Sequence, residues 1–368
     1  MNMKIAMVSP TRESERAISG YSVTLTENIK KTETDIEDVS YVAGSPMSFL
    51  KMIPKLKKYN IVHIQHEYNL LGYYGLPFFL VYLILGFNKN NKIITTMHNI
   101  LSKKEKFKEN KLKIFLRRVL YLSQNKLINW ASDLIIVHSD FFVPILTKEY
   151  NISSRKIIVV PQGIIENVKK IPKDKAKKEL KLSGDVYLVI GNLTPDSGAD
   201  IPLKYADKIG KTVLVVSSPI PVNDRKKQRL KEYLNFLEGF VKKKKSEKYV
   251  RFDIKPISDQ MPIWWVYFSA ADFVLQAYRG GIGSGIFAHA MAAGTPVVSS
   301  DIPFFKDIEK RYGCIKTVKN EKDFPRIIKE ALKQKNYKKM KGESERYLKE
   351  RGLSSIAKEY KKIYLSLR

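Results

Sequence analysis

The chain has 368 residues, 44% of them hydrophobic and 11% aromatic, so it is long and apolar enough to bury two cores. Its single cysteine, Cys314, excludes an internal disulfide and fits a reducing compartment. The formal net charge of +29 is compatible with binding to nucleic acid, to an anionic membrane or to a negatively charged substrate. It is equally compatible with lysines spread over solvated helix faces that bind no partner. No RNA-recognition, zinc-finger or interleaved basic-aromatic pattern is present, so nucleic acid is not favoured.

The N-terminal sequence MNMKIAMVSPTRESERA has too short an apolar run for a secretory signal and predicts a buried strand. The longest apolar run, residues 76–87 (LPFFLVYLILGF), is shorter than the ~20 residues of a membrane-spanning helix. With the basic segment 102–122, this run either covers a sheet or lies on an anionic membrane. We therefore expect a cytoplasmic protein, with a peripheral position on the cytoplasmic membrane face as the alternative.

Short β-branched runs alternate with helical patterns along the chain. Most of these runs are apolar throughout, which is typical of parallel strands covered on both faces. A polar segment, residues 166–185, separates two series of them. The predicted strands lie at 4–9, 61–64, 92–98, 133–139 and 156–163, and then at 186–193, 212–218, 249–255, 272–278, 295–300 and 314–317.

This pattern predicts an α/β protein with two doubly wound, Rossmann-like parallel-sheet domains. If the carboxyl ends of the two sets of strands face each other, a cleft lies between the domains, and ligands collect there. The predicted parts are a first domain at 1–165, a linker at 166–183, a second domain at 184–345 and a terminal segment at 346–368.

The histidines are placed unevenly along this pattern. His63, His66, His98 and His138 fall at or just past predicted strand ends of the first domain, and His289 falls on a helix of the second. A single histidine at a strand end is more often structural than catalytic. Four of them in one domain favour a functional site there.

The stretch YRGGIGSGIFAHAMAAGTPVVSS, residues 278–300, combines a strand end, four glycines within residues 280–285 and a helix that begins at Ser284 or Gly285. Unpaired amides at a helix N-terminus bind phosphate, and glycines let the phosphate approach closely. Arg279 offers a bidentate contact to the same anion. The alternative is a tight turn with no ligand, although such a turn needs fewer glycines. A second amide-rich loop is predicted at Ser19, Gly20 and Tyr21.

The sequence offers no metal site, because it has no cysteine cluster and no HExxH pattern. It also lacks a P-loop and a nucleophile elbow. We therefore expect neither a metal nor a cofactor.

Several motifs occur together in a recognisable order. They are SPTRE…ISGYS, IVHIQHEYNLLG, IITTMHNI, ASDLIIVHS, KIIVVPQGI, GNLTPDSGAD and SAADFVLQAY…SG…AMAAGTPVVSSDIP, which span residues 3–310. The series resembles the family 4 retaining glycosyltransferases of GT-B fold, and QHEY with a Tyr…SG elbow resembles one subgroup. The resemblance implies sugar transfer from a nucleotide-sugar with retained configuration, an acceptor on the first domain, a donor on the second and a last helix that crosses back to the first domain.

The resemblance also implies site residues. His98 matches the family histidine that contacts the donor sugar, and His66 and Glu67 of QHEY are implied contacts to the acceptor or sugar. These three are the catalytic candidates. The donor-binding candidates are Gly163, Asn192, Ser197, Arg279, Gly281, Gly283, Ser284, Gly285 and His289.

Four positions depart from the family pattern. The two usual glutamates would fall at Gly281 and His289, and the usual Arg and Lys would fall at Asn192 and Ser197. Arg279, the elbow amides and the loop at Ser19 to Tyr21 are expected to compensate. Two alternatives follow: transfer of a hexose from GDP-mannose or UDP-glucose type donors to a glycan or lipid-linked acceptor, or a non-catalytic homologue that binds sugar or nucleotide or partners an active transferase.

Overall fold

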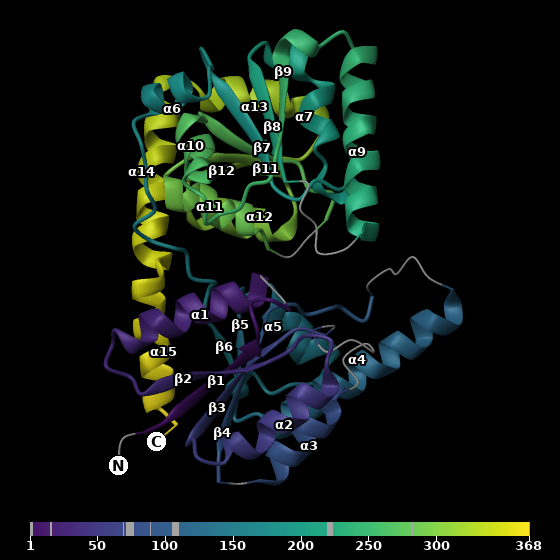
Figure 1. The fold of residues 1–368 in the computed structure, drawn as a ribbon, viewed down its shortest axis with the longest axis vertical. Helices are drawn as coiled ribbons and strands as arrows, with labels where there is room; N and C mark the ends of the chain where they lie inside the picture. The colour runs from purple at the N-terminus through teal and green to yellow at the C-terminus, as the bar shows by residue number, and fades with distance from the viewer. Residues whose placement is uncertain are drawn as a thin grey trace. The chain divides into compact units, whose positions relative to one another are not determined.

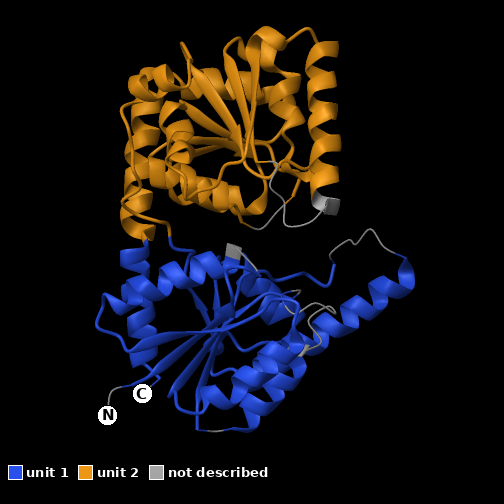
Figure 2. Ribbon diagram, viewed as in Figure 1, with its two compact units in different colours: residues 1–163, 353–368 blue, residues 164–352 orange. Residues whose placement is uncertain are grey.

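The structure, a computed structural model, describes residues 3–14, 17–68, 70, 77–88, 90–104, 110–218, 224–280 and 283–367. It divides into two compact units (Figure 2). Unit 1 comprises Met1–Gly163 and Leu353–Arg368, and unit 2 comprises Ile164–Gly352. Each unit is built around its own sheet, and each is described by itself.

Unit 1 holds a six-stranded parallel sheet in the order β2-β1-β3-β4-β5-β6 (Figure 1). Its strands are β1 Ile5–Pro10, β2 Ile36–Tyr41, β3 Ile61–His66, β4 Lys92–Met97, β5 Leu134–Val137 and β6 Ile157–Val159. Its helices are α1 Ala17–Lys30, α2 Pro46–Leu56, α3 Pro77–Phe87, α4 Lys111–Ala131, the short α5 Phe142–Pro144, a π-helical turn Ile145–Glu149 and α15 Leu353–Leu365.

Helices cover both faces of this sheet, as the apolar strands require. Alternate residues of a strand point to opposite faces. On β3, His63 bonds to Tyr364 of α15, whereas the ring of His66 lies 6.1 Å from that of Tyr82 of α3. Helices α1 and α15 therefore share one face, and α3 lies on the other.

Strand β2 is present in the structure but was not predicted from the sequence. Its sequence is IEDVSY, and only its two end residues are buried. It lies at the edge of the sheet, where one side of the backbone ladder has no neighbouring strand. A polar edge strand lacks the continuous apolar run by which the other strands are recognised.

Unit 2 holds a second six-stranded parallel sheet, in the order β12-β11-β10-β7-β8-β9. Its strands are β7 Val186–Ile190, β8 Thr212–Ser217, β9 Val250–Ile254, β10 Phe273–Gln276, β11 Val297–Ser300 and β12 Ile315–Val318. Its helices are α6 Lys173–Glu179, α7 Asp200–Lys204, α8 Ala206–Ile209, α9 Asp224–Lys243, α10 Pro262–Ala270, α11 Gly285–Ala293, α12 Pro303–Arg311, α13 Phe324–Ala331 and α14 Gln334–Arg351. One apolar cluster joins α6, α10, α11 and α12 to the sheet, and another joins α7, α8, α9 and α13 to it.

The segment predicted as a linker, residues 166–183, contains helix α6 and packs into unit 2. Ala176 is fully buried in the unit 2 core. The side chains of Lys173 and Lys177 lie 2.7 and 3.0 Å from the Asp272 carboxylate, which also accepts a hydrogen bond from the amide of Val186. These contacts tie the segment to the first strand of unit 2.

The prediction of a loop at Ser19 to Tyr21 is wrong. These residues lie inside α1, where the hydroxyl of Ser22 donates to the carbonyl oxygen of Ile18 at 2.7 Å. The described residues after β1 end at Ser14 and α1 begins at Ala17, so the helix begins earlier than expected. Within the described residues, no helix is both long and apolar enough to cross a membrane.

Candidate functional site

The N-terminus of α11 lies at the carboxyl end of β10. Ser284 caps the helix, accepting a hydrogen bond from the amide of Phe287 at 3.0 Å. This confirms the predicted helix start, and Gly294 ends the helix in the left-handed conformation. The helix provides no acceptors for its own first amides, and amides so placed can donate to an anion.

Two side chains on β10 and the residues after it support this cap. The Gln276 amide nitrogen donates to the hydroxyl of Ser284 at 2.9 Å, and the Tyr278 hydroxyl lies 3.1 Å from the same oxygen. Gln276 is 3% exposed, and its side-chain oxygen has no hydrogen-bond partner among the described residues. The sequence interpretation missed Gln276 and Tyr278, although their place at the strand end pointed to them.

Two glycines bring neighbouring loops against this end of the sheet. Gly191 follows β7 with φ +124°, and a Cβ there would lie 3.0 Å from the side chain of Ile286 in the first turn of α11. Gly198 has φ +65°, and a Cβ there would collide with the carbonyl oxygen of Ala277. Both positions need glycine, for backbone conformation and for space. The loops after β7 and β10 therefore pack directly on each other.

Arg279 is exposed, but its guanidinium is engaged by neighbouring groups of unit 2. It forms a bidentate pair with Asp200, at 2.8 and 2.5 Å, and also donates to the carbonyl oxygen of Pro195. Its backbone amide donates to the carbonyl oxygen of Asp196 at 3.0 Å. Despite the cost of burial, the hydrogen bond from Arg279 keeps the pKa of Asp200 below its ordinary value. Arg279 thus ties the loop after β7 to the end of β10.

The other donor candidates of unit 2 differ in their surroundings. Asn192 is exposed, and Ser197 forms a capping box with Thr194 at the short 3₁₀ turn Pro195–Ser197. His289 packs between the rings of Trp264 and Trp265, and its Nδ1 accepts a hydrogen bond from the Trp264 indole at 3.2 Å. Burial lowers the pKa of His289. Gly283 is exposed with open space for a Cβ, and Gly281 lies outside the described residues.

In unit 1, His98 follows β4 and is held by a chain of hydrogen bonds. Gln65 directs its amide nitrogen to the sulfur of Met7 at 3.0 Å, so its oxygen accepts from His98 Nε2–H at 2.7 Å. This leaves Nδ1 of the half-buried His98 ring able to accept a hydrogen bond from a ligand. Burial, together with nearby His138 and His63, holds the pKa of His98 well below its ordinary value, so the ring is neutral near pH 7.

Three more residues gather around His98. The Tyr21 ring meets those of His98 and His138 edge to face at 5.7 and 5.9 Å, and the two histidine rings are 5.0 Å apart. The Tyr21 hydroxyl lies 3.5 Å from the amide of Gly163. Burial raises the pKa of Tyr21 to about 12. Although the loop prediction was wrong, Tyr21 reaches this cluster from α1.

His66 lies on the opposite face of the sheet from His63 and Gln65. It is fully buried, packs against Tyr68 and Tyr82, and is hydrogen-bonded to Gln124, with a pKa that burial lowers to about 3. Such a ring contacts core residues, so the structure gives His66 no contact surface for a sugar. Glu67, the next residue, is half-buried.

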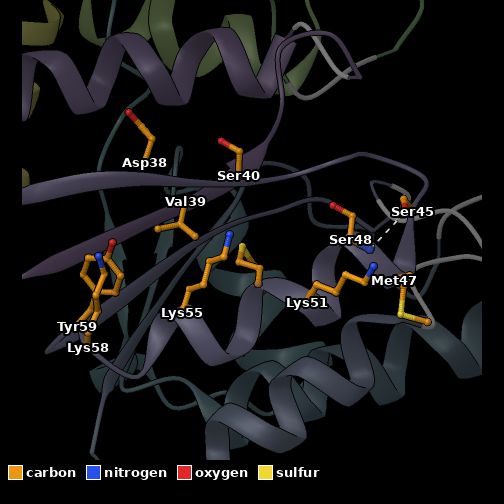
Figure 3. A pocket seen from close by; sticks show the side chains of 11 residues that line it. Asp38, Val39, Ser40, Ser45, Met47, Ser48, Lys51, Lys55, Lys58 and Tyr59 are labelled. Atoms are coloured by element: carbon orange, nitrogen blue, oxygen red, sulfur yellow. Dashed lines mark hydrogen bonds between the residues drawn. The ribbon is translucent and has the colours of Figure 1, made fainter.

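A groove of about 790 Å³ opens between β2 and α2 in unit 1 (Figure 3). Lys51, Lys55 and Ser48 line it, and Lys58 at its end is paired with Glu37 at 3.4 Å. No predicted site residue lines this groove. Among the described residues, no group of three or more His, Cys, Asp or Glu side chains is arranged to hold a metal ion.

No protein-family model matches the sequence, and no curated protein matches it significantly. Solved structures do match over nearly the whole chain. HepE of Anabaena in complex with UDP has a TM-score of 0.72 at 14% identity, covering 99% of this chain and 100% of that one. Sucrose-phosphate synthase of Thermosynechococcus elongatus has a TM-score of 0.73 at 14% identity, covering 100% and 99%. A glycosyltransferase of Rickettsia africae has a TM-score of 0.69 at 13% identity, covering 100% and 98%.

The chain has the GT-B fold. The two parallel six-stranded sheets confirm the predicted α/β class, and all eleven strands predicted from the sequence are found. In terms of this fold, His98, Tyr21, His138 and Gly163 form a cluster on the N-terminal unit, and the α11 N-terminus forms a candidate anion site on the C-terminal unit.

Proposed function

We propose that the chain is a retaining glycosyltransferase that moves a hexose, of mannose or glucose type, from a nucleotide-sugar to a glycan or lipid-linked acceptor. The observation that carries this proposal is the capped α11 N-terminus at the carboxyl end of β10, which the loops containing Gly191 and Gly198 approach closely. The fold it shares with HepE, which has also been solved with UDP-glucose, supports the same proposal.

In this proposal unit 2 stabilises the leaving diphosphate. The charge that develops on the diphosphate oxygens meets the first amides of α11 and the positive end of the helix dipole. The hydroxyl of Ser284 is already engaged by Gln276 and Tyr278, which orient it before a ligand arrives. In this proposal the first amides of α11 and the helix dipole, and not a metal ion, stabilise the departing diphosphate.

Unit 1 contributes a neutral acceptor of hydrogen bonds. Nδ1 of His98 accepts from a hydroxyl group of the donor sugar, while its Nε2–H remains bonded to Gln65. Transfer with retention needs little covalent chemistry from the protein. The acceptor hydroxyl attacks from the face that the diphosphate leaves, the sugar–phosphate bond breaks, and the hydroxyl proton passes to the departing phosphate oxygen. His98 therefore acts by positioning the sugar and not by proton transfer.

Arg279 takes a different role from the expected diphosphate contact. Its guanidinium is bound to Asp200, so it contributes by holding the loop after β7 in place. This pairing also supports the second candidate function, a non-catalytic homologue. Asn192 and Ser197 stand where the resemblance implies basic residues, so unit 2 offers the diphosphate few positive side chains.

The test incubates the chain with UDP- and GDP-linked glucose and mannose, with and without glycan and lipid-linked acceptors, and measures nucleotide release. Acceptor-dependent release from one donor, with an α-linked product from an α-linked donor, is the expected result. His98→Ala should abolish release without unfolding the chain. Binding of a nucleotide-sugar without release under any acceptor would favour the non-catalytic homologue.

A further inference from the structure

Large apolar side chains are exposed on one part of unit 1. Nine of the fifteen that are exposed among the described residues belong to α3 and α4. On α4 these are Leu112, Phe115, Leu116, Val119 and Trp130. Soluble proteins rarely leave so many large apolar side chains together, and such a patch marks an interaction surface.

Helix α4 carries a stripe of large apolar side chains on its exposed side. Leu112, Phe115, Leu116 and Val119 follow the spacing i, i+3, i+4, i+7, which places them on one side of the helix. They are between 44% and 68% exposed. The opposite side is buried and carries Tyr121, Gln124, Asn125, Ile128 and Ala131. The apolar stripe of α4 therefore faces away from the core of its own unit.

The exposed side chains of α3 continue this stripe. Phe87, at the end of α3, is 75% exposed, and its ring lies 5.1 Å from that of Trp130 near the end of α4. Gly86 lets the two helices approach, because a Cβ there would collide with the Trp130 ring. Leu80, Leu83 and Ile84 are exposed along α3. We call these nine side chains the α3–α4 patch.

The charged residues of the two helices are of one sign. Helix α3 has no charged residue, and α4 contains Lys and Arg but neither Asp nor Glu. Lys111, Lys113 and Lys126 are exposed on α4. A second copy of the chain would bring two such basic rims together, which is unfavourable. An apolar face bordered by lysines instead matches the boundary between acyl chains and anionic headgroups.

We propose that the α3–α4 patch binds the surface of an anionic membrane, with α4 lying in the plane of the headgroups. Neither helix is long and apolar enough to span the bilayer, so the contact is peripheral. Trp130 and Phe115 enter the region between headgroups and acyl chains, and the lysines contact lipid phosphates. The inference goes beyond sugar transfer and does not depend on it.

The test mixes the full chain with vesicles of phosphatidylcholine alone or of phosphatidylcholine with phosphatidylglycerol, and measures sedimentation with the vesicles. The chain should sediment with the anionic vesicles and much less with the neutral ones, and added salt should weaken the binding. The triple variant Leu112→Gln, Phe115→Gln, Leu116→Gln should reduce partitioning about tenfold or more. Phe236→Gln is the matched control, because Phe236 is 53% exposed on α9, outside the patch.

Tryptophan fluorescence tests the same proposal on the native chain, without the triple variant. Trp264 and Trp265 are 7% and 8% exposed, whereas Trp130 is 47% exposed. Anionic vesicles should shift the emission to shorter wavelength, and Trp130→Phe should remove that shift. An unchanged emission, or equal sedimentation of the native chain and the triple variant, overturns the proposal. A dimer in solution that the triple variant converts to monomer would also overturn it, because a second copy would then cover the patch.

Discussion

His63 Nδ1 lies 2.7 Å from the hydroxyl of Tyr364, which joins the middle of β3 to the last helix of the chain. The other ring nitrogen of His63 lies 2.7 Å from the hydroxyl of Thr96 and 3.4 Å from the amide nitrogen of Gln65. Since Gln65 also accepts from His98, an unbroken path of polar contacts runs from α15 to the candidate sugar-binding histidine.

Tyr364→Phe should lower the free energy of unfolding by about 1–3 kcal/mol, because it leaves a buried imidazole nitrogen without its partner. Urea denaturation followed by circular dichroism measures this change. Tyr249→Phe, at a half-buried tyrosine of unit 2, serves as the control and should change the free energy little. An equal effect of the two substitutions would remove the structural role given to Tyr364.

Stability should fall as the pH is lowered below the ordinary histidine value. Burial lowers the pKa of both His63 and His66 from 6.5 to about 3. The unfolded chain therefore binds more protons than the folded chain between these values, and stability is fully present above about pH 6.5 and lost as the pH falls. Each of the two histidines should lower the free energy of unfolding by about 1.4 kcal/mol for each pH unit below 6.5 in this window.

Urea denaturation between pH 7 and 5 measures that slope, in a range where most carboxylates remain ionised. His63→Gln and His66→Gln should each make the slope shallower. A free energy of unfolding that does not change from pH 7 to 5 would mean that these rings are not held neutral.

Gly198→Ala should destabilise unit 2 by about 2–4 kcal/mol, because it combines a left-handed backbone with a collision against the carbonyl of Ala277. Gly210→Ala is the matched control: its φ is +68°, but the nearest atom to the added Cβ would be 3.7 Å away. It should cost only about 1 kcal/mol. Thermal unfolding compares the two variants. Similar losses of stability would show that the close approach of the two loops does not contribute to the stability of unit 2.

A double-mutant cycle on Arg279 and Asp200 tests the role given to this pair. Arg279 is 43% exposed, so the coupling energy should be modest, about 1 kcal/mol, despite the bidentate geometry. Asp200→Asn should also leave nucleotide affinity unchanged or lower it by loosening the loop. A higher affinity in Asp200→Asn would mean that the aspartate competes with the nucleotide for Arg279.

The strands and the glycine elbow were predictable from the sequence because their signals are local. Buried parallel strands are continuous apolar runs, and the helix start at Ser284 is marked by its capping residue and glycines. Strand β2 escaped prediction because it is a polar edge strand. The segment 166–183 was predicted as a linker because its lysines look solvated, whereas two of them bind Asp272.

The site was less predictable, because side-chain partners far apart in the sequence decide it. Arg279 was predicted to bind phosphate, whereas it pairs with Asp200. The two residues lie 79 positions apart, and no local pattern around Arg279 predicts this pair. His66 ends β3 and His98 follows β4, yet one faces the core and the other is half-exposed. Strand alternation could have separated His66 from His63, since adjacent positions on β3 differ in the face that they present.

In the proposed function, the N-terminus of α11 binds the diphosphate of a nucleotide-sugar. Gly285→Asp tests it well, because the added side chain would meet open space and an acidic residue in the first turn favours the helix. The same carboxylate repels a diphosphate. Gly239→Asp on α9 also has open space for its Cβ and makes the same change of charge away from the site.

The measurement is calorimetric titration of the native chain and both variants with UDP, GDP and their hexose derivatives, with thermal unfolding of each variant. We predict micromolar binding of one nucleotide series, weakened about tenfold or more by Gly285→Asp and unchanged by Gly239→Asp, with no loss of thermal stability in Gly285→Asp. Equal affinity of the native chain and Gly285→Asp, or no binding of any nucleotide, would contradict the account.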